Sequence, residues 1–337
     1  MEVETLFDFP ESRTDKHTRT SSSPIGTVFM ARRIILDCDP GIDDSVALSM
    51  ALFHPSLDVL AVTAVEGNVP ADMATKNVQT VVEQLDPPRL PRIGAATPND
   101  NSDYRDACFI HGRDGLGEAG FVTADHHQRH LSEKIICDEV RAAPGEIDIV
   151  CLGPLTNVAK AMQRDSLFIE NVGEIVMMGG SFSGIGNITQ TAEFNIHCDP
   201  ESAREVFHAP VKKTLIPLDI TSQVQFSLSI MEQLPDKSTS VGAFLRRVLP
   251  YLFRSYRQQL GLETVQIHDA IALMQLIEPD LFELEDYAGD VEVSGELTRG
   301  MTVFERRRGK TAPHNLQVAR VVAASAARQA VIKCLNT

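Results

Sequence analysis

The segment RIILDCDPGIDDSVALSMAL, residues 33–52, predicts a strand, a turn and a helix in immediate succession. The run from Arg33 to Leu36 is typical of a buried strand, and the pattern from Ser45 to Leu52 indicates a helix. Between them, Pro40 favours extended backbone at the preceding residue, and Gly41 permits an unusual turn. The sequence therefore places a polar turn directly after a buried strand.

This turn carries four carboxylates, Asp37, Asp39, Asp43 and Asp44, within eight residues. The dipole of the following helix favours negative charge in its first turn by only ~1 kcal/mol. Closely packed carboxylates repel one another far more in a low dielectric. A hard divalent cation with oxygen ligands is the simplest resolution. The alternative is a helix-capping cluster on a solvated turn, although capping needs only one such acid.

The composition is that of a soluble globular protein, with 43% hydrophobic and 23% charged residues among 337. A net charge of −15 argues against nonspecific binding to nucleic acid and to anionic membranes. We expect no membrane span and no signal peptide, because no apolar segment is long enough. The six cysteines form no CxxC pair and fit neither a zinc site nor a disulfide framework. A reducing, cytoplasmic location is the expected consequence.

The chain is expected to contain one domain, residues 30–337, preceded by a disordered arm at residues 1–29. The arm is polar and includes a run of three serines followed by Pro24. Met30 directly precedes the first strand and is a candidate translational start, which the intact mass of the native protein tests.

Strand and helix patterns alternate from residue 32 onward, which predicts a mostly parallel, Rossmann-like sheet flanked by helices. A small antiparallel extension is expected near the C-terminus. The predicted strands span residues 33–36, 57–65, 147–152, 174–178 and 213–218, with a short one beginning at 93 and an antiparallel pair at 291–294 and 301–304. The predicted helices span residues 45–52, 70–85, 131–142, 155–162, 200–207, 268–277 and 318–335, with a helical region at 228–262.

Polar clusters follow four of these strands, at residues 37–44, 66–68, 153–157 and 179–195. Ligands of parallel sheets bind beyond the carboxyl ends of the strands. If the four strands are parallel, the clusters converge on one edge of the sheet.

These clusters resemble those of the nucleoside hydrolases, which cleave the N-glycosidic bond of ribonucleosides in purine and pyrimidine salvage. The resemblance extends over residues 33–330 in order. The motifs that carry it are the aspartate signature at 37–44, Glu66-Gly67-Asn68, Ile110-His111-Gly112, Gly153-Pro154-Leu155-Thr156-Asn157, Gly186-Asn187, Ala192-Glu193-Phe194-Asn195, Leu218-Asp219-Ile220-Thr221, Ile267-His268-Asp269 and Thr298-Arg299-Gly300.

The resemblance implies the nucleoside hydrolase fold and one Ca²⁺ per subunit. The implied ligands are Asp39, Asp44, Asp269 and the backbone carbonyl of Leu152, a position where the family often has another side chain. They suit the preference of calcium for six to eight oxygens. Asp39 would also act as the base on a water that the ion acidifies. Without the resemblance, Asp269 would also be explained as the N-cap of the following helix.

The resemblance also assigns the residues that bind the ribonucleoside. Asp43 would hold the 2′-hydroxyl, and Asn68, Asn187, Glu193 and Asn195 would bind the other sugar hydroxyls. Met178 would lie beneath the sugar, although a strand core residue explains it equally well.

His268 is the implied acid that protonates the departing base, since histidine titrates near neutrality. His111 and Tyr256 are candidates for contacting the base or closing over it, with ordinary packing as the alternative. The chain has no tryptophan for stacking on purines, which favours the inosine–uridine type. Relatives are dimers or tetramers, so a homodimer or homotetramer is expected.

Two other functions compete with this hypothesis. Asp37 and Asp39 mimic the Asp-x-Asp pair of haloacid-dehalogenase-like phosphohydrolases, but the later acidic motif and lysine of that class are not found. The second is a nucleoside-binding or calcium-binding relative without catalysis. An EF-hand is excluded because Leu48 stands at its twelfth position. An NAD site is excluded because the first strand does not lead to a GxGxxG turn.

Overall fold

The structure is a computed structural model that describes residues 31–99, 107–124, 130–307 and 312–337. The predicted disordered arm at residues 1–29 and the candidate start at Met30 lie outside the described residues. From Ala31 to Thr337 the chain forms one compact unit.

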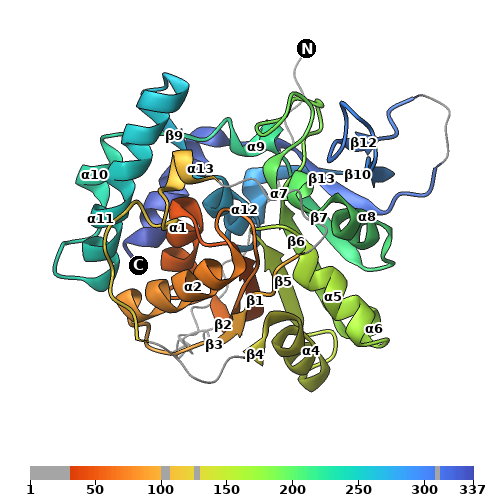
Figure 1. Ribbon diagram of the computed structural model, residues 1–337, viewed down its shortest axis with the longest axis horizontal. Coiled ribbons are helices and arrows are strands. Elements are labelled where there is room, and N and C mark those ends of the chain that lie inside the picture. Colours follow the sequence, from red (N-terminus) through yellow and green to blue (C-terminus); the bar gives the residue numbers. More distant parts are fainter. Residues whose placement is uncertain (1–30, 100–106, 125–129, 308–311) are drawn as a thin grey trace, which may run out of the picture. The chain divides into compact units, whose positions relative to one another are not determined.

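A nine-stranded sheet crosses this unit, and the strand before the acidic turn lies in its interior (Figure 1). The strand order is β10-β13-β7-β6-β5-β1-β2-β3-β4, and every neighbouring pair is parallel except β10 with β13. The strands are β1 (Arg32–Cys38), β2 (Leu57–Ala64), β3 (Arg92–Ala95), β4 (His130–Leu131), β5 (Ile147–Cys151), β6 (Glu174–Met178), β7 (Lys212–Ile216), β10 (Phe282–Tyr287) and β13 (Leu316–Val322).

Helices cover both faces of the sheet because side chains of a strand alternate between faces. Ile34 and Leu36 of β1 pack into the core on one face, and Ile35 packs into the core on the other. The first face is covered by α1 (Ile42–Ala51), α2 (Ala71–Leu85), α11 (Ser240–Ser255), α12 (His268–Ile277) and α13 (Ala324–Leu335). The second is covered by α4 (Ser132–Ala142), α5 (Thr156–Arg164), α6 (Phe168–Asn171) and α8 (Pro200–His208). The predicted fold, a mostly parallel sheet flanked by helices, is thus confirmed.

Two short antiparallel pairs stand outside the large sheet. One joins β11 (Gly289–Val291) to β12 (Thr302–Phe304), close to the predicted extension near the C-terminus. The other joins β8 (Gln225–Ser227) to β9 (Thr264–Gln266) and was not predicted.

The helix predicted over residues 318–335 is wrong in its first part, because Val318 to Val322 belong to β13. The segment VARVV is rich in β-branched residues, and its pairing with β7 on one side and β10 on the other determines its conformation. The helix α13 begins only at Ala324. The strand β10 was missed as well, although Phe282 and Leu284 alternate with acids in it.

Two further boundaries differ from the prediction. The strand predicted over 213–218 ends at Ile216, since Pro217 cannot donate a ladder hydrogen bond. The next four residues form the short helix α9 (Leu218–Thr221). The helical region predicted over 228–262 divides into α10 (Ile230–Gln233), α11 and a π-helix, η1 (Tyr256–Leu260).

The parallel arrangement brings the carboxyl ends of β1, β2, β5 and β6 to one edge of the sheet, as predicted. Within the described ranges, none of the helices combines the length and apolarity needed to cross a membrane.

Candidate active site

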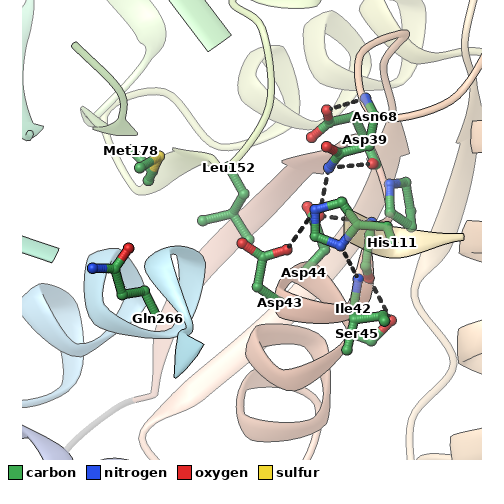
Figure 2. Close-up of polar contacts among 12 residues, drawn as sticks. Asp39, Ile42, Asp43, Asp44, Ser45, Asn68, His111, Leu152, Met178 and Gln266 are labelled. Atoms are coloured by element: carbon green, nitrogen blue, oxygen red, sulfur yellow. Dashed lines mark hydrogen bonds and ion pairs between the residues drawn. The ribbon is translucent and has the colours of Figure 1, made fainter. Parts of the chain in front are cut away.

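The acidic turn is tied into the first turn of α1, a helix whose residues are all buried. The Gly41 N–H donates to Asp44 Oδ2 at 2.8 Å, and the Ser45 hydroxyl donates to the Gly41 carbonyl at 2.7 Å. From the end of β2, Asn68 Nδ2 donates to the Asp39 carbonyl at 3.1 Å and reaches Asp44 Oδ2 at 3.4 Å. Figure 2 shows Asp39, Asp43 and Asp44 arranged around these contacts.

Asp37 anchors the end of the central strand and does not line the cavity described below. Its Oδ1 accepts hydrogen bonds from the Thr63 hydroxyl at 2.6 Å and from Asn157 Nδ2 at 2.8 Å. Burial raises the pKa of Asp37 to about 7 against the lowering effect of these two bonds. Its Oδ1 is thus committed to β2 and α5, while its Oδ2 is buried without a hydrogen-bond partner among the described residues. The position of Asp37 outside the cavity lining argues against an Asp37–Asp39 nucleophile and acid pair.

The Asp39 carboxylate is held between two glycines from different loops. Its Oδ2 accepts the Asn68 N–H at 2.6 Å. A Cβ added to Gly67 would overlap this oxygen, and one added to Gly153 would lie 2.6 Å from Asp39 Oδ1. Burial, followed by the charge of Asp44, raises the pKa of Asp39 well above its usual range. Both glycines stand in motifs that the sequence identified, but their role as walls around Asp39 was not predicted.

Three other carboxylates form a compact oxygen cluster: those of Asp43, Asp44 and Asp269. One oxygen from each lies within 4.8 Å of the others. Asp269 arrives in the first turn of α12, which packs against α1. Burial is the main cause that raises the pKa of Asp43 to about 6 and of Asp44 to about 7. Burial and the neighbouring acids also raise the pKa of Asp269 well above its usual range.

This cluster fits a hard divalent cation. Asp43 Oδ1 and Asp44 Oδ1 are buried and have no hydrogen-bond partner among the described residues. Buried charges without partners are costly, and oxygen donors are the ligands that calcium prefers. The cluster shares Asp44 and Asp269 with the predicted ligand set, but its third member is Asp43 where the prediction has Asp39. The Leu152 carbonyl, the predicted fourth ligand, accepts Asn195 Nδ2 at 2.6 Å.

A cavity of about 310 Å³ opens beside the cluster and collects most of the predicted site. Its lining includes eleven predicted residues, namely Asp43, Asn68, His111, Leu152, Met178, Asn187, Glu193, Asn195, Tyr256, His268 and Asp269. Asp39 and Asp44 are not part of the lining. The size is at the lower end of small-molecule sites. The lining combines polar side chains, called the polar wall below, with apolar ones, called the apolar wall.

The apolar wall was not predicted as part of the site. Leu252 and Leu260 line the cavity together with Tyr256, at intervals of four residues across the junction of α11 and η1. That spacing is the signal that could have identified them. Phe109 and Ile110 from α3 (Cys108–His111) and the polar Gln266 also belong to the lining. The Tyr256 hydroxyl donates to the Gln266 carbonyl at 3.4 Å.

His111 is fixed by the start of α1. Its Nδ1 accepts the Ile42 N–H at 3.2 Å, and its Nε2 lies 3.8 Å from Asp43 Oδ1 (Figure 2). Burial lowers the pKa of His111 to about 4. In the neutral ring, the proton therefore lies on Nε2, the nitrogen nearer Asp43.

His268 begins α12 and is paired with α9. Its Nδ1 lies 2.7 Å from the Thr221 hydroxyl oxygen. Burial, followed by the charge of His111, lowers the pKa of His268 to about 4. Thr221 belongs to one of the sequence motifs, but the sequence predicts no role for it.

The residues predicted to bind sugar hydroxyls organise α7 (Phe194–Cys198) at the same time. Glu193 accepts the backbone N–H groups of Gly180, Asn195 and Ile196 at 2.9 to 3.1 Å. Asn187 Oδ1 accepts the Phe194 N–H at 2.9 Å. Burial raises the pKa of Glu193 to about 7 against the effect of these backbone bonds.

Asn195 is bonded to the ends of β5 and β6. Besides Leu152, its amide nitrogen reaches the Met178 carbonyl at 3.2 Å and the Met178 sulfur at 3.5 Å. The nitrogen is thereby used inside the protein, so the amide oxygen is the atom with which Asn195 can accept a bond from a ligand.

The chain is similar to known proteins over most of its length. Residues 34–329 match the model of the family described as inosine-uridine preferring nucleoside hydrolase. The non-specific ribonucleoside hydrolase RihC of Salmonella agona is 37% identical over 289 residues, which is 85% of this chain and 92% of that protein. A probable uridine nucleosidase 2 of Oryza sativa subsp. japonica is 35% identical over 276 residues, which is 81% of this chain and 82% of that protein.

Solved structures show the same similarity. The plant nucleoside hydrolase PpNRh1 superimposes with a TM-score of 0.82 at 30% identity, covering 91% of this chain and 99% of that chain. A purine-preferring ribonucleoside hydrolase from Gardnerella vaginalis superimposes with a TM-score of 0.83 at 26% identity, covering 90% and 98%.

Proposed function

This chain belongs to the inosine-uridine preferring nucleoside hydrolase family, and we propose that it splits ribonucleosides with the carboxylates at the sugar and His268 at the base. The family establishes a nucleoside hydrolase; the assignment of roles to residues is the proposal. The observation that carries the proposal is that Asp43, Asp269 and His268 all line the same cavity. Water attack at C1′ and departure of the base need groups on both sides of one bond.

Asp39 is the proposed base. Breaking the N-glycosidic bond builds positive charge on the ribose, and an attacking water must lose a proton. A carboxylate can accept that proton. The Asn68 N–H and the two flanking glycines keep its carboxylate in one orientation.

One Ca²⁺ per subunit is the proposed cofactor. Asp44 and Asp269, which belong to both the predicted set and the observed cluster, would hold it. Asp39 and the Leu152 carbonyl complete the predicted set, and Asp43 is the third carboxylate beside Asp44 and Asp269. When bound, the ion neutralises the repulsion among these acids and makes a nearby water more acidic. Calorimetric Ca²⁺ titration of Asp39→Ala and Asp43→Ala shows which of the two carboxylates contributes to binding.

The ribose is proposed to lie against the polar wall. Asp43 would accept the 2′-hydroxyl, a bond that strengthens as positive charge develops on the sugar. Asn68, Asn187, Glu193 and Asn195 would bind the remaining hydroxyls, with Met178 beneath the ring. All of these side chains line the cavity, and this supports the proposal.

The base is proposed to lie against the apolar wall and within reach of His268. His268 would supply a hydrogen bond, and then a proton, to the departing base. His111 and Tyr256 are proposed to contact the base or close over it. Both line the cavity, and His111 keeps a proton on Nε2.

Release of ribose from inosine, uridine, cytidine, adenosine and guanosine tests the reaction and its base preference. Asp39→Ala is expected to abolish release while leaving the fold intact. His268→Ala is expected to lower kcat strongly for these substrates and little for p-nitrophenyl riboside, whose leaving group needs no proton. Near wild-type ribose release by Asp39→Ala would refute the role of Asp39, and equal losses on both substrate types would refute that of His268.

We propose a homodimer or homotetramer in the cytoplasm. None of the six cysteines, all of which lie among the described residues, forms a disulfide, which is consistent with a reducing compartment. Light scattering after size exclusion tests the oligomer.

A further inference from the structure

The motif Leu218-Asp219-Ile220-Thr221 lies beside His268, and the proposed function assigns no role to its four residues. It forms α9, directly after β7 and Pro217. Thr221 has no exposed surface, and its hydroxyl oxygen lies 2.7 Å from Nδ1 of His268. Thr221 of α9 thus contacts the imidazole ring of His268, which belongs to α12.

The hydroxyl of Thr221 has this ring nitrogen as its only hydrogen-bond partner among the described residues. Two arrangements of the hydrogen bond are possible. In the first, the hydroxyl donates to a bare Nδ1, and the ring proton lies on Nε2. In the second, Nδ1–H donates to the hydroxyl oxygen, and the hydroxyl proton then has no acceptor in a fully buried position.

A buried donor without an acceptor destabilises the folded protein. The first arrangement leaves no such donor, so it is favoured. A neutral imidazole has a single N–H, and its position decides whether the ring can donate into the cavity.

His111 shows the same arrangement at the same cavity. Its Nδ1 also accepts a bond from the protein, in that case from the backbone N–H of Ile42, so its proton is also on Nε2. Both histidines therefore turn their Nδ1 toward the protein and keep their Nε2 as the donor.

We propose that Thr221 is a positioning residue that holds His268 in the tautomer with its proton on Nε2, from which the ring donates a hydrogen bond to the departing base. This inference rests on the proposed role of His268 in leaving-group departure. Thr221 itself touches neither the base nor the sugar; it acts through the ring of His268.

The tautomer can be measured directly in the wild-type protein with Ca²⁺ added. Long-range ¹H–¹⁵N correlation spectra of protein labelled in the histidine rings distinguish the two nitrogens, and His268→Gln assigns the signals. We expect the proton of His268 on Nε2. A proton found on Nδ1 overturns the inference, whatever the variants do.

Three threonine variants then separate positioning from stability. Thr221→Val keeps the shape and removes the hydroxyl, and Thr221→Ser keeps the hydroxyl. The matched control is Thr214→Val, which removes another fully buried hydroxyl, one that donates to Glu174 Oε1 at 2.6 Å away from the cavity. Thr221→Val is expected to change the tautomer population of His268, whereas Thr221→Ser and Thr214→Val leave it unchanged.

Kinetics provide the second readout. Thr221→Val is expected to lower kcat at least tenfold on inosine or uridine and less than twofold on p-nitrophenyl riboside, with KM unchanged. Thr221→Ser should restore most of the loss. Equal losses on both substrates, or an unchanged tautomer in Thr221→Val, overturn the inference.

His268→Gln distinguishes the failure of this inference from failure of the proposed function. If His268→Gln loses activity equally on natural and activated substrates, the proposed role of His268 is wrong. If His268→Gln is selective for natural substrates but Thr221→Val is not, only the positioning role of Thr221 is wrong.

Discussion

Replacing Gly67 by alanine tests how strictly the position of the Asp39 carboxylate matters. A Cβ at residue 67 would overlap Asp39 Oδ2 and lie 2.7 Å from Asp39 Cγ. Carbon atoms in contact are about 3.5 Å apart or more. The carboxylate must therefore move by about 1 Å, because the two atoms nearest to the new methyl group, Oδ2 and Cγ, belong to the carboxylate of Asp39.

The magnitude follows from two losses. The movement breaks the bond in which Asp39 Oδ2 accepts the Asn68 N–H at 2.6 Å. A hydrogen bond to a charged group is worth about 1.5–3 kcal/mol, so the free energy of unfolding should fall by about 2 kcal/mol. A displacement of about 1 Å in catalytic geometry costs about 100-fold in rate, so kcat on uridine or inosine should fall by about that factor.

Ribose release measures kcat, and urea unfolding followed by circular dichroism measures stability. The control is Gly145→Ala, where an added Cβ meets nothing within 4 Å although φ is +77°. That variant should lose about 1 kcal/mol of stability through backbone strain and keep its kcat. If Gly67→Ala keeps kcat within threefold of wild type while Asp39→Ala is inactive, the reasoning from carboxylate position is refuted.

Removal of divalent ions with EGTA should lower Tm by several degrees, and added Ca²⁺ should restore it in wild type but not in Asp44→Ala. The reason is that a ligand at 100 times its Kd stabilises the folded state by about 3 kcal/mol. An equal response of both proteins would contradict the ion site. Glu193→Gln should lower the free energy of unfolding, measured in urea, by about 2 kcal/mol. One of the two oxygens that accept buried backbone N–H groups is replaced by an amide nitrogen, which is a donor. Unchanged stability would argue that these bonds to Glu193 do not stabilise the start of α7. Burial lowers the pKa of Lys213 from 10.5 to about 8, so the folded protein loses this proton first and its free energy of unfolding should rise between pH 8 and 10.5. In Lys213→Met that rise should be smaller, and identical pH profiles would show that Lys213 does not cause it.

The strand, turn and helix at residues 33–52 could be predicted because each is encoded locally, by an apolar run, a proline–glycine pair and a helical pattern. Parallel pairing then implied that the clusters after several strands meet. Asp269 is different: no local pattern links it to Asp44, and only the resemblance to the nucleoside hydrolases brought it to the site.

Other features depend on contacts that no local pattern shows. Val318 to Val322 form a strand because β7 and β10 offer them partners, so the helical pattern of the following residues was extended too far. The orientation of Asp39 depends on Gly67 and Gly153, which come from two loops after two different strands. The bond between Thr221 and His268 depends on how α9 lies against α12, which sequence spacing does not determine.

The order of the strands has a consequence for synthesis on the ribosome. The interior strand β1 and its acidic turn are made before the other strands of the sheet, and its two neighbours, β2 and β5, become available later. Asp269, on α12, follows only after seven of the nine strands of the sheet have been made. A nascent chain therefore carries the acids of its turn without Asp269 for most of its translation. The three-carboxylate cluster is consequently complete only in the nearly finished protein, and an ion that binds there would stabilise the fold only late in its biogenesis.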